Sequence, residues 1–274
     1  PAPTLPAPAA PSPTPPPRPT QAHEPVEAAG CAESRGALTS LAVASPTLRY
    51  AIDTRVYLPP CYGEPGRRYP VLYLLHGLGF TEDQWERLGV AAAADELIRA
   101  GEIAPLIIVM PRDRRDERLD PALVKDLVPY IDAQYATLAA RPARAIGGLS
   151  RGGGWAVHFG LRYPETFGRV GLHSPAVFYS DEVSLLEWAR GLKDKPAPAI
   201  YIDTGENDAT IRSPLWLDQV FTWFKVEHTF IVQPGGHTEA YWAKHVREYL
   251  TFYAADWRSL PLLDEGQPAA PPGD

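Results

Sequence analysis

The residues best suited to chemistry form a G-x-S-x-G pentapeptide at positions 148–152, with Ser150 at its centre. The pentapeptide follows a short apolar run, residues 144–146, and precedes a segment predicted to be a helix, residues 151–163. This pattern between a strand and a helix is typical of a nucleophile elbow, a sharp turn that exposes the serine hydroxyl. Glycine is required where the two backbones approach closely, because it has no Cβ. We therefore expect Ser150 to act as a nucleophile.

A serine hydroxyl is a weak nucleophile and needs a histidine to take its proton and a carboxylate to orient that histidine. Asp208 lies shortly after the apolar run 199–202 and is the leading candidate for the carboxylate. Glu206 remains an alternative, whereas Asp203 ends the predicted strand and is expected to be structural. An Asx turn or a helix N-cap would explain Asp208 without catalysis.

His237 is the best candidate for the base, because it follows two glycines after the apolar run 229–232 and precedes the last predicted helix. His173 also ends an apolar run, but no acid at a strand end lies between it and Ser150, so we expect it to line the pocket. The other candidates start a strand, lie inside a helix or precede the serine: His228, His245, His158 and His76.

An oxyanion hole requires two backbone N–H groups that face the developing negative charge. One is expected from Arg151, which follows the nucleophile, and the other from Leu78 in the loop at residues 76–80. His76 is expected to support this loop through side-chain hydrogen bonds. An ordinary strand-to-helix turn is the alternative explanation of the loop.

Several aromatic residues on loops or helix starts are positioned to surround a pocket for an aromatic or medium-length apolar acyl group. Core or lid packing is the alternative for each of them. The predicted substrate contacts are Phe80, Trp85, His173 and Trp216, with Phe178 and Tyr179 nearby. Trp242 is expected to pack beneath the loop of His237.

The elements that must position these groups alternate between apolar strands and helices from residue 69 onward. Strands separated by helices predict an α/β fold with a doubly wound, mostly parallel sheet. The segment 175–195 is expected to be irregular. The predicted strands are residues 71–75, 106–110, 144–146, 170–172, 199–203 and 229–232, and the predicted helices are residues 86–100, 124–135, 151–163, 215–225 and 239–253.

Two further strands, residues 38–45 and 47–58, are predicted to form an N-terminal antiparallel hairpin. This pairing brings Cys31 close to Cys61. A disulfide between them fits an exported protein, and two unrelated thiols are the alternative.

Composition divides the chain into three parts. Residues 1–29 are rich in Pro, Ala, Thr and Ser and are predicted to be a disordered spacer, residues 30–258 to form one domain, and residues 259–274 to be a disordered tail. Because the chain starts at a proline, we expect that a secretion signal or lipid-anchoring peptide was removed, although a chosen sequence boundary would look the same. We therefore expect a secreted or cell-surface protein, either free or a lipoprotein, with a membrane tether only through that removed segment.

Charge and hydropathy argue against a nucleic-acid partner and against a membrane-spanning segment. The net charge of −7 argues against a nucleic-acid surface. No apolar run approaches the ~18 residues of a membrane span. Four arginines and three acidic residues interleave over residues 112–118, which predicts a solvated loop or helix start. We expect a monomer or weak homodimer.

Together these motifs resemble the esterase D-like family of esterases, which includes bacterial feruloyl esterases, enterobactin-type siderophore esterases and the mycolyltransferases of the antigen 85 group. The resemblance implies an α/β-hydrolase fold, Ser150 as nucleophile, Asp208 as acid and His237 as base, with no metal or organic cofactor. The lid at residues 175–195 matches no substrate-specific member, so the acyl group is left open. The resemblance runs from about residue 50 to residue 257 and rests on residues 57–60, 69–77, 148–152, 203–208, 235–238 and 241–242.

The predicted function is hydrolysis of a carboxylic ester through an acyl-enzyme, with a feruloyl-type, acetyl, or short to medium acyl group. The substrate would be a small-molecule or polysaccharide-linked ester. Two other classes stay open: an acyltransferase to a sugar or lipid acceptor on the same residues, and a non-catalytic binding protein. The complete Ser, Asp and His set in chain order argues against the last.

Overall fold

The computed structural model describes residues 31–114 and 119–260. The chain divides into two units, residues 1–32 and 33–274, and the sheet and helices described below belong to the second. The expected spacer at residues 1–29 lies outside the described residues, as does most of the expected tail at residues 259–274. The proposed domain boundaries therefore remain predictions.

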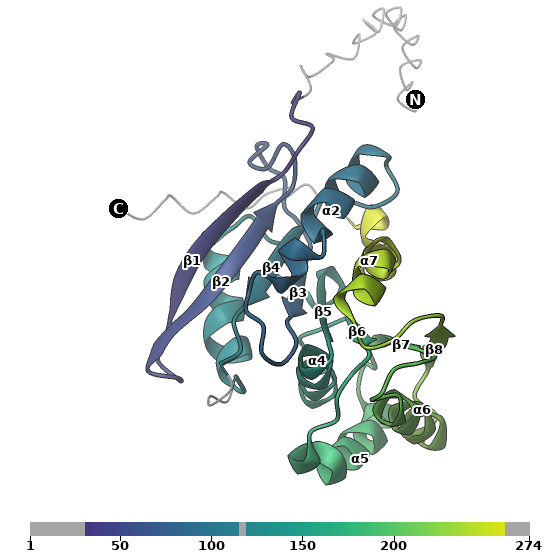
Figure 1. Cartoon of the computed structure of the whole chain (residues 1–274). Helices are drawn as coiled ribbons and strands as arrows, with labels where there is room; N and C mark the ends of the chain where they lie inside the picture. Colours follow the sequence, from purple (N-terminus) through teal and green to yellow (C-terminus); the bar gives the residue numbers. More distant parts are fainter. Residues whose placement is uncertain (1–30, 115–118, 261–274) are drawn as a thin grey trace, which may run out of the picture. The chain divides into compact units, whose positions relative to one another are not determined.

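The described strands form one eight-stranded sheet with an antiparallel hairpin at one edge (Figure 1). The strands are β1 (Ala37–Ser45), β2 (Tyr50–Leu58), β3 (Val71–Leu75), β4 (Ile107–Pro111), β5 (Arg144–Leu149), β6 (Arg169–His173), β7 (Ala199–Gly205) and β8 (His228–Gln233). Their order is β1-β2-β4-β3-β5-β6-β7-β8. β2 pairs antiparallel with β1 and β4, and the other neighbours pair parallel. The predicted fold class, an α/β-hydrolase fold with an N-terminal hairpin, is confirmed.

Helices cover both faces of the sheet because the central strands are apolar on both faces. In β3, Val71, Tyr73 and Leu75 pack on one face, and Leu72 and Leu74 pack on the other. The helices are α1 (Gln84–Arg87), α2 (Val90–Arg99), α3 (Val128–Gln134), α4 (Arg151–Arg162), α5 (Glu182–Gly191), α6 (Arg212–Phe224) and α7 (Glu239–Tyr253). α1, α2 and α7 pack on the face of Leu72, and α3 to α6 pack on the other. Among the described residues, no helix has both the length and the apolar character needed to cross a membrane.

Short helical turns complete the secondary structure. The π-helical turn is η1 (Leu123–Leu127), and the 3-10 turns are η2 (Arg141–Ala143), η3 (Tyr179–Asp181), η4 (Leu192–Asp194) and η5 (Trp257–Ser259). The predicted disulfide is present, since Cys31 and Cys61 are both disulfide-bonded.

The structure differs from the predicted elements in four places. The helix expected at residues 124–135 begins with the π-helical turn η1, and only α3 is α-helical. The helix expected at residues 86–100 is divided into α1 and α2, because Gly89 adopts a left-handed conformation with φ of 87°. The segment 175–195, expected to be irregular, contains α5. In α5 only Leu185 and Ala189 are buried, so its sequence carries a weak apolar period. α6 begins before residue 215 because Pro214 is accommodated in its first turn.

The charge run is only partly solvated. Residues 115–118 lie outside the described residues. Arg114 is exposed as expected, but Asp113 is buried. The reason is that its carboxylate accepts hydrogen bonds from Arg151 and Trp155 of α4.

Candidate active site

The turn between β5 and α4 holds Ser150 in a strained backbone conformation, with φ of 53° and ψ of −118°. The flanking glycines are needed there. A Cβ on Gly148 would lie 2.3 Å from the carbonyl carbon and oxygen of Gly152, and one on Gly152 would lie 2.1 Å from the carbonyl oxygen of Leu75. Because such strain persists only where the surroundings enforce it, this turn has the geometry of a nucleophile elbow.

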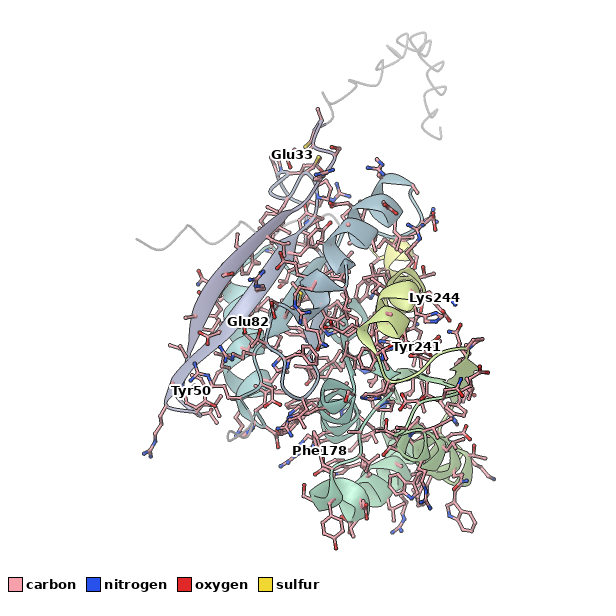
Figure 2. All side chains as sticks on the ribbon, in the orientation of Figure 1. Glu33, Tyr50, Glu82, Phe178, Tyr241 and Lys244 are labelled. Carbon is pink, nitrogen blue, oxygen red and sulfur yellow. The ribbon has the colours of Figure 1, made fainter. Side chains whose placement is uncertain are left out.

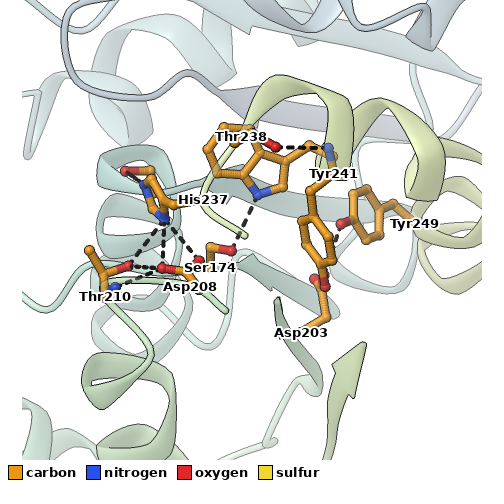
Figure 3. A network of polar contacts seen from close by, with 10 residues as sticks. Ser174, Asp203, Asp208, Thr210, His237, Thr238, Tyr241 and Tyr249 are labelled. Atoms are coloured by element: carbon orange, nitrogen blue, oxygen red, sulfur yellow. Dashed lines mark hydrogen bonds and ion pairs between the residues drawn. The ribbon is translucent and has the colours of Figure 1, made fainter. Parts of the chain in front are cut away.

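His237 lies within hydrogen-bonding distance of both Ser150 and Asp208. Figure 3 shows its ring beside Asp208 and Thr210. Its Nε2 is 2.9 Å from Ser150 Oγ, and its Nδ1 is 2.9 Å from Asp208 Oδ2. His237 sits in the loop between β8 and α7, and Thr238 caps α7 by accepting a hydrogen bond from the N–H of Tyr241. The side chain of His237 is 25% exposed, whereas that of Asp208 is fully buried. Solvent thus reaches the histidine but not its carboxylate partner.

Hydrogen-bond donors keep Asp208 ionised. The hydroxyl and the backbone N–H of Thr210 each donate to Asp208 Oδ1 at 2.7 Å. Burial raises the pKa of Asp208, but hydrogen bonds from Thr210, Ser174 and His237 outweigh burial and hold its pKa below the ordinary value. The Asx turn considered for Asp208 is therefore present, and it coexists with the contact to His237.

The loops that carry Asp208 and His237 are bound to each other. The N–H of Asn207 donates to the Gly235 carbonyl at 2.8 Å, and a Cβ on Gly205 would lie 2.5 Å from Gly235. Glu206, the alternative acid, is exposed and accepts a hydrogen bond from the side chain of Asn207. The structure therefore brings Asp208, and not Glu206, to His237.

The loop after β3 carries Leu78, the second expected oxyanion donor, and His76 supports it. His76 Nδ1 lies 2.8 Å from the Gly77 carbonyl, and its Nε2 accepts a hydrogen bond from the N–H of Asp113. Burial lowers the pKa of His76, which favours the neutral ring that this pair of hydrogen bonds requires. Within the described part of the chain, neither Leu78 N–H nor Arg151 N–H donates a hydrogen bond to another backbone group. His76 supports the loop as expected, and both N–H groups remain available to a substrate oxygen.

Two predicted substrate contacts are wrong. His173 is 0% exposed, with Nδ1 2.6 Å from Asp203 Oδ1 and Nε2 2.8 Å from Tyr253 Oη. Trp85 is also buried, and its indole N–H donates to the Leu75 carbonyl. Both side chains fill the core beneath the strand ends, so neither lines an open pocket. Asp203 is structural as expected, since it is fully buried.

The other predicted aromatic residues lie in different surroundings. Phe80 is exposed and lines a cleft of about 550 Å³ beside Leu78. Trp216 is partly buried and packs against the core on the side of α6, outside the lining of that cleft. Trp242 is buried with its ring 5.0 Å from that of His237, which confirms that it packs beneath the loop.

Sequence reasoning missed Ser174 and Thr210, which orient Asp208. Thr210 follows Asp208 by two residues, a spacing typical of an Asx turn, and this signal was available in the sequence. Ser174 had no comparable signal, because its contact with Asp208 depends on β6 lying beside β7.

The sulfur atoms of Cys31 and Cys61 are bound in the disulfide and are not available as thiolate ligands for a metal.

The strand order, the turn at Ser150 and the loops after β7 and β8 define the α/β-hydrolase class. The model of the family described as Putative esterase matches residues 45–253. The chain therefore belongs to this esterase family, a class of carboxylic ester hydrolases, as the sequence motifs predicted.

Named relatives agree with this family. The chain is 37% identical over 145 residues to an endo-1,4-beta-xylanase/feruloyl esterase of Xylanibacter ruminicola and 32% identical over 150 residues to esterase Rv1288 of Mycobacterium tuberculosis. These matches cover 47% and 49% of this chain but only 20% and 31% of the relatives. The chain thus spans less than a third of the length of these two proteins.

Solved structures match over nearly their whole length. A ferulic acid esterase superposes with a TM-score of 0.74 at 26% identity, covering 81% of this chain and 98% of the esterase. An S-formylglutathione hydrolase (FrmB) of Staphylococcus aureus superposes with a TM-score of 0.72 at 22% identity, covering 81% and 98% of the two chains. The second likeness supports the fold alone.

Proposed function

We propose that this chain is a serine esterase that hydrolyses carboxylic esters through an acyl-enzyme intermediate. The observation that carries the proposal is the hydrogen-bonded series of Ser150 Oγ, His237 and Asp208 at the carboxyl ends of parallel strands. Such a series can remove the hydroxyl proton as the oxygen attacks, and it provides the orienting carboxylate that a neutral histidine base needs.

In the first step, Ser150 Oγ attacks the ester carbonyl while its proton passes to His237 Nε2. The carbonyl oxygen becomes negative, and the N–H groups of Leu78 and Arg151 are proposed to donate to it. Collapse of this intermediate breaks the ester bond, and His237 returns the proton to the leaving alkoxide. The products are the free alcohol and an acyl group on Ser150.

In the second step, His237 takes a proton from water, which attacks the acyl carbonyl. The bond to Ser150 Oγ breaks, the oxygen regains its proton, and the carboxylic acid leaves. Asp208 remains ionised throughout, consistent with its lowered pKa, and stabilises the positive charge on His237.

The feruloyl esterase among the relatives and the ferulic acid esterase among the solved structures favour an aromatic acyl group. Acetyl and other short to medium acyl groups fit the same chemistry. The exposed Phe80 beside Leu78 supplies an apolar surface next to the proposed oxyanion position. The disulfide favours an extracytoplasmic location for the activity.

Hydrolysis of p-nitrophenyl esters from acetate to octanoate tests this function, with Ser150→Ala as the test variant. Ser40→Ala, an exposed serine on β1, is the matched control. We expect hydrolysis by the wild type and the control, and none above background by Ser150→Ala. Equal rates in Ser150→Ala and the wild type would exclude Ser150 as the nucleophile. Added alcohol that outcompetes water for the acyl group would instead indicate the acyltransferase.

A further inference from the structure

A cleft of about 550 Å³ opens beside the proposed oxyanion N–H groups. Its walls are the loop after β3, the residues that follow β4 and the first residue of α4. Because Leu78 and Arg151 both line the cleft, a substrate whose carbonyl oxygen meets their N–H groups would lie next to it.

The cleft is positively charged, although the chain as a whole carries a net charge of −7. Among the described residues, its lining includes Arg112, Arg114 and Arg151 and one acidic residue, Asp113. Asp53, which pairs with Arg112 and Arg114, and Glu82, which lies near Arg112, do not line the cleft. The described part of the lining therefore has an excess of cationic groups.

Arg151 is held in place by its neighbours. Its Nε donates to Asp113 Oδ2 at 2.6 Å, and its guanidinium lies over the rings of Trp155 and Phe178 at 5.8 Å and 5.3 Å. Asp113 is itself fixed, because it also accepts a hydrogen bond from the Trp155 indole at 2.9 Å. The two terminal nitrogens of Arg151 form no hydrogen bond with other described residues. A preorganised guanidinium of this kind can donate to a carboxylate at little entropic cost.

Arg112 is more accessible than Arg151, whose side chain is 22% exposed. Its side chain is 40% exposed, and its nitrogens lie 3.7 Å from Asp53 and 3.9 Å from Glu82, too far for hydrogen bonds. Arg112 can therefore turn toward a ligand without losing a hydrogen bond to either acid. Glu82 lies in the loop between β3 and α1 (Figure 2).

We propose that this cleft binds a carboxylate group of the substrate, with Arg112 and Arg151 as donors. Arginine presents parallel N–H groups that match the two oxygens of a carboxylate. The proposal rests on the proposed function, because it places this carboxylate near the ester that Ser150 attacks. The carboxylate is carried by either the alcohol or the acyl part, and the test distinguishes these two sources.

Two pairs of esters test the cleft. In the first pair, p-nitrophenyl acetate is compared with carboxy-p-nitrophenyl acetate, whose leaving group is charged. In the second pair, p-nitrophenyl benzoate is compared with its para-carboxy derivative, whose acyl group is charged. We expect a higher kcat/KM for the charged member of at least one pair, and a loss of about tenfold for that member in Arg112→Gln, the change expected on removing one charge-assisted hydrogen bond.

Arg112→Lys should retain part of the preference, and Arg190→Gln on α5, outside the cleft, should retain all of it. The readout in all three variants is the ratio of kcat/KM for the charged and the neutral member of a pair, and hydrolysis of the neutral esters should be nearly unchanged in Arg190→Gln. If neither charged ester is preferred, or if Arg112→Gln leaves the preference intact, the cleft does not bind a carboxylate.

A binding measurement separates this proposal from the esterase proposal. In Ser150→Ala, calorimetry would compare the anionic probes carboxy-p-nitroanisole and para-carboxybenzamide with the neutral probes p-nitroanisole and benzamide. Tighter binding of either charged probe, weakened by Arg112→Gln, supports the cleft even if no ester is hydrolysed, in which case only the proposed function fails. Equal binding of charged and neutral probes overturns the cleft proposal even if hydrolysis depends on Ser150.

Discussion

Asp203 and Asp208, near the end of β7, each form a hydrogen bond with a histidine. The two histidines differ in their exposure to solvent. Asp203 and His173 are both fully buried, and Asp203 also accepts hydrogen bonds from Tyr241 and Tyr249 (Figure 3). Asp208 is buried, but its partner His237 is partly exposed and reaches Ser150. Only the second pair can pass a proton to a substrate.

Replacing Asp208 with asparagine should lower kcat for p-nitrophenyl butyrate by about 10³- to 10⁴-fold, because an amide stabilises neither the required tautomer nor the charged form of His237. Glu206→Gln is the matched control, since Glu206 is exposed two residues away, and it should retain kcat within about twofold. The converse result, a large loss in Glu206→Gln and none in Asp208→Asn, would assign the acid to Glu206.

For single residues, the sequence was sufficient to predict that Ser150, His237 and Asp208 come together. It was not sufficient to predict which side chains near them are buried. Chain order and strand ends were sufficient to select Asp208 and His237 as partners for Ser150. The burial of His173 and Trp85 could not be predicted, because it depends on how α1 and α7 pack against the sheet. For the same reason, the sequence did not predict that Asp113 is buried, although it lies in a charge run that was expected to be solvated.

Among the elements, α7 packs closely on the sheet where Tyr253 fits against Gly147 and Gly171, and we call this contact the slot. Gly147 and Gly171 are paired across β5 and β6, and a Cβ on either would lie 1.6 Å or 2.0 Å from Tyr253 Oη. The same hydroxyl lies 2.8 Å from His173 Nε2. The slot therefore fixes the end of α7, whose opposite end begins next to His237.

Gly147→Ala should lower the free energy of unfolding by about 1–3 kcal/mol or more, because the new methyl group overlaps Tyr253. The matched control is Gly191→Ala at the end of α5, where nothing lies within 4 Å of the added Cβ and the change should be within about 0.5 kcal/mol. Urea unfolding of the three proteins would measure both effects. Equal stability of Gly147→Ala and the wild type would show that the slot is not filled.

α4 and the start of α5 are joined through a buried histidine. His158 Nδ1 lies 2.6 Å from Asp181 Oδ2, and its Nε2 lies 3.2 Å from Asp120 Oδ2. Burial lowers the pKa of His158, but the carboxylates of Asp120 and Asp181 outweigh burial and raise it above the ordinary value. Arg162 also contacts Asp120 and remains charged across the range in which His158 titrates.

This raised pKa predicts how stability depends on pH. Because His158 binds its proton more tightly in the folded state, its contribution is complete below the unfolded pKa of about 6.5 and is lost as pH rises through the folded pKa. The difference in unfolding free energy between the wild type and His158→Gln should therefore shrink with rising pH, as measured by urea unfolding from about pH 5 to 9. A constant difference over that range would contradict this assignment.

Elements with a strong pattern were predicted closely. β3 is apolar at every position and α7 begins after a Thr cap, and both were predicted with the bounds that the structure shows. α5 was missed because few of its residues are buried, and the interruption at Gly89 was missed because a single glycine is compatible with a helical pattern. Weak amphipathic character therefore limited the prediction more than topology did.

For the whole domain, the parallel arrangement collects the proposed site at one edge of the sheet. Ser150, Asp208 and His237 follow β5, β7 and β8, so each side chain comes from the carboxyl end of a strand. Open α/β sheets place their sites at this edge because the connecting loops meet there. The alternation of strands and helices was sufficient to predict this convergence, whereas the charged cleft beside it required the three-dimensional packing of Arg151.

The disulfide of Cys31 and Cys61 is expected to stabilise the fold. A Cys31→Ser/Cys61→Ser double variant should lose about 3 to 4 kcal/mol of unfolding free energy on the chain-entropy model, because the unfolded chain is no longer constrained. Chemical unfolding with and without reductant would measure this loss. An unchanged midpoint in the double variant would show that the bond contributes no stability.

The central claim is that Ser150 carries the acyl group during turnover. The most direct measurement is mass spectrometry of the protein quenched in acid during hydrolysis of p-nitrophenyl butyrate, followed by peptide mapping. We predict a butyryl adduct on the peptide containing Ser150 in the wild type, and none in Ser150→Ala or His237→Gln. An adduct on a different residue, or its persistence in Ser150→Ala, would contradict this account.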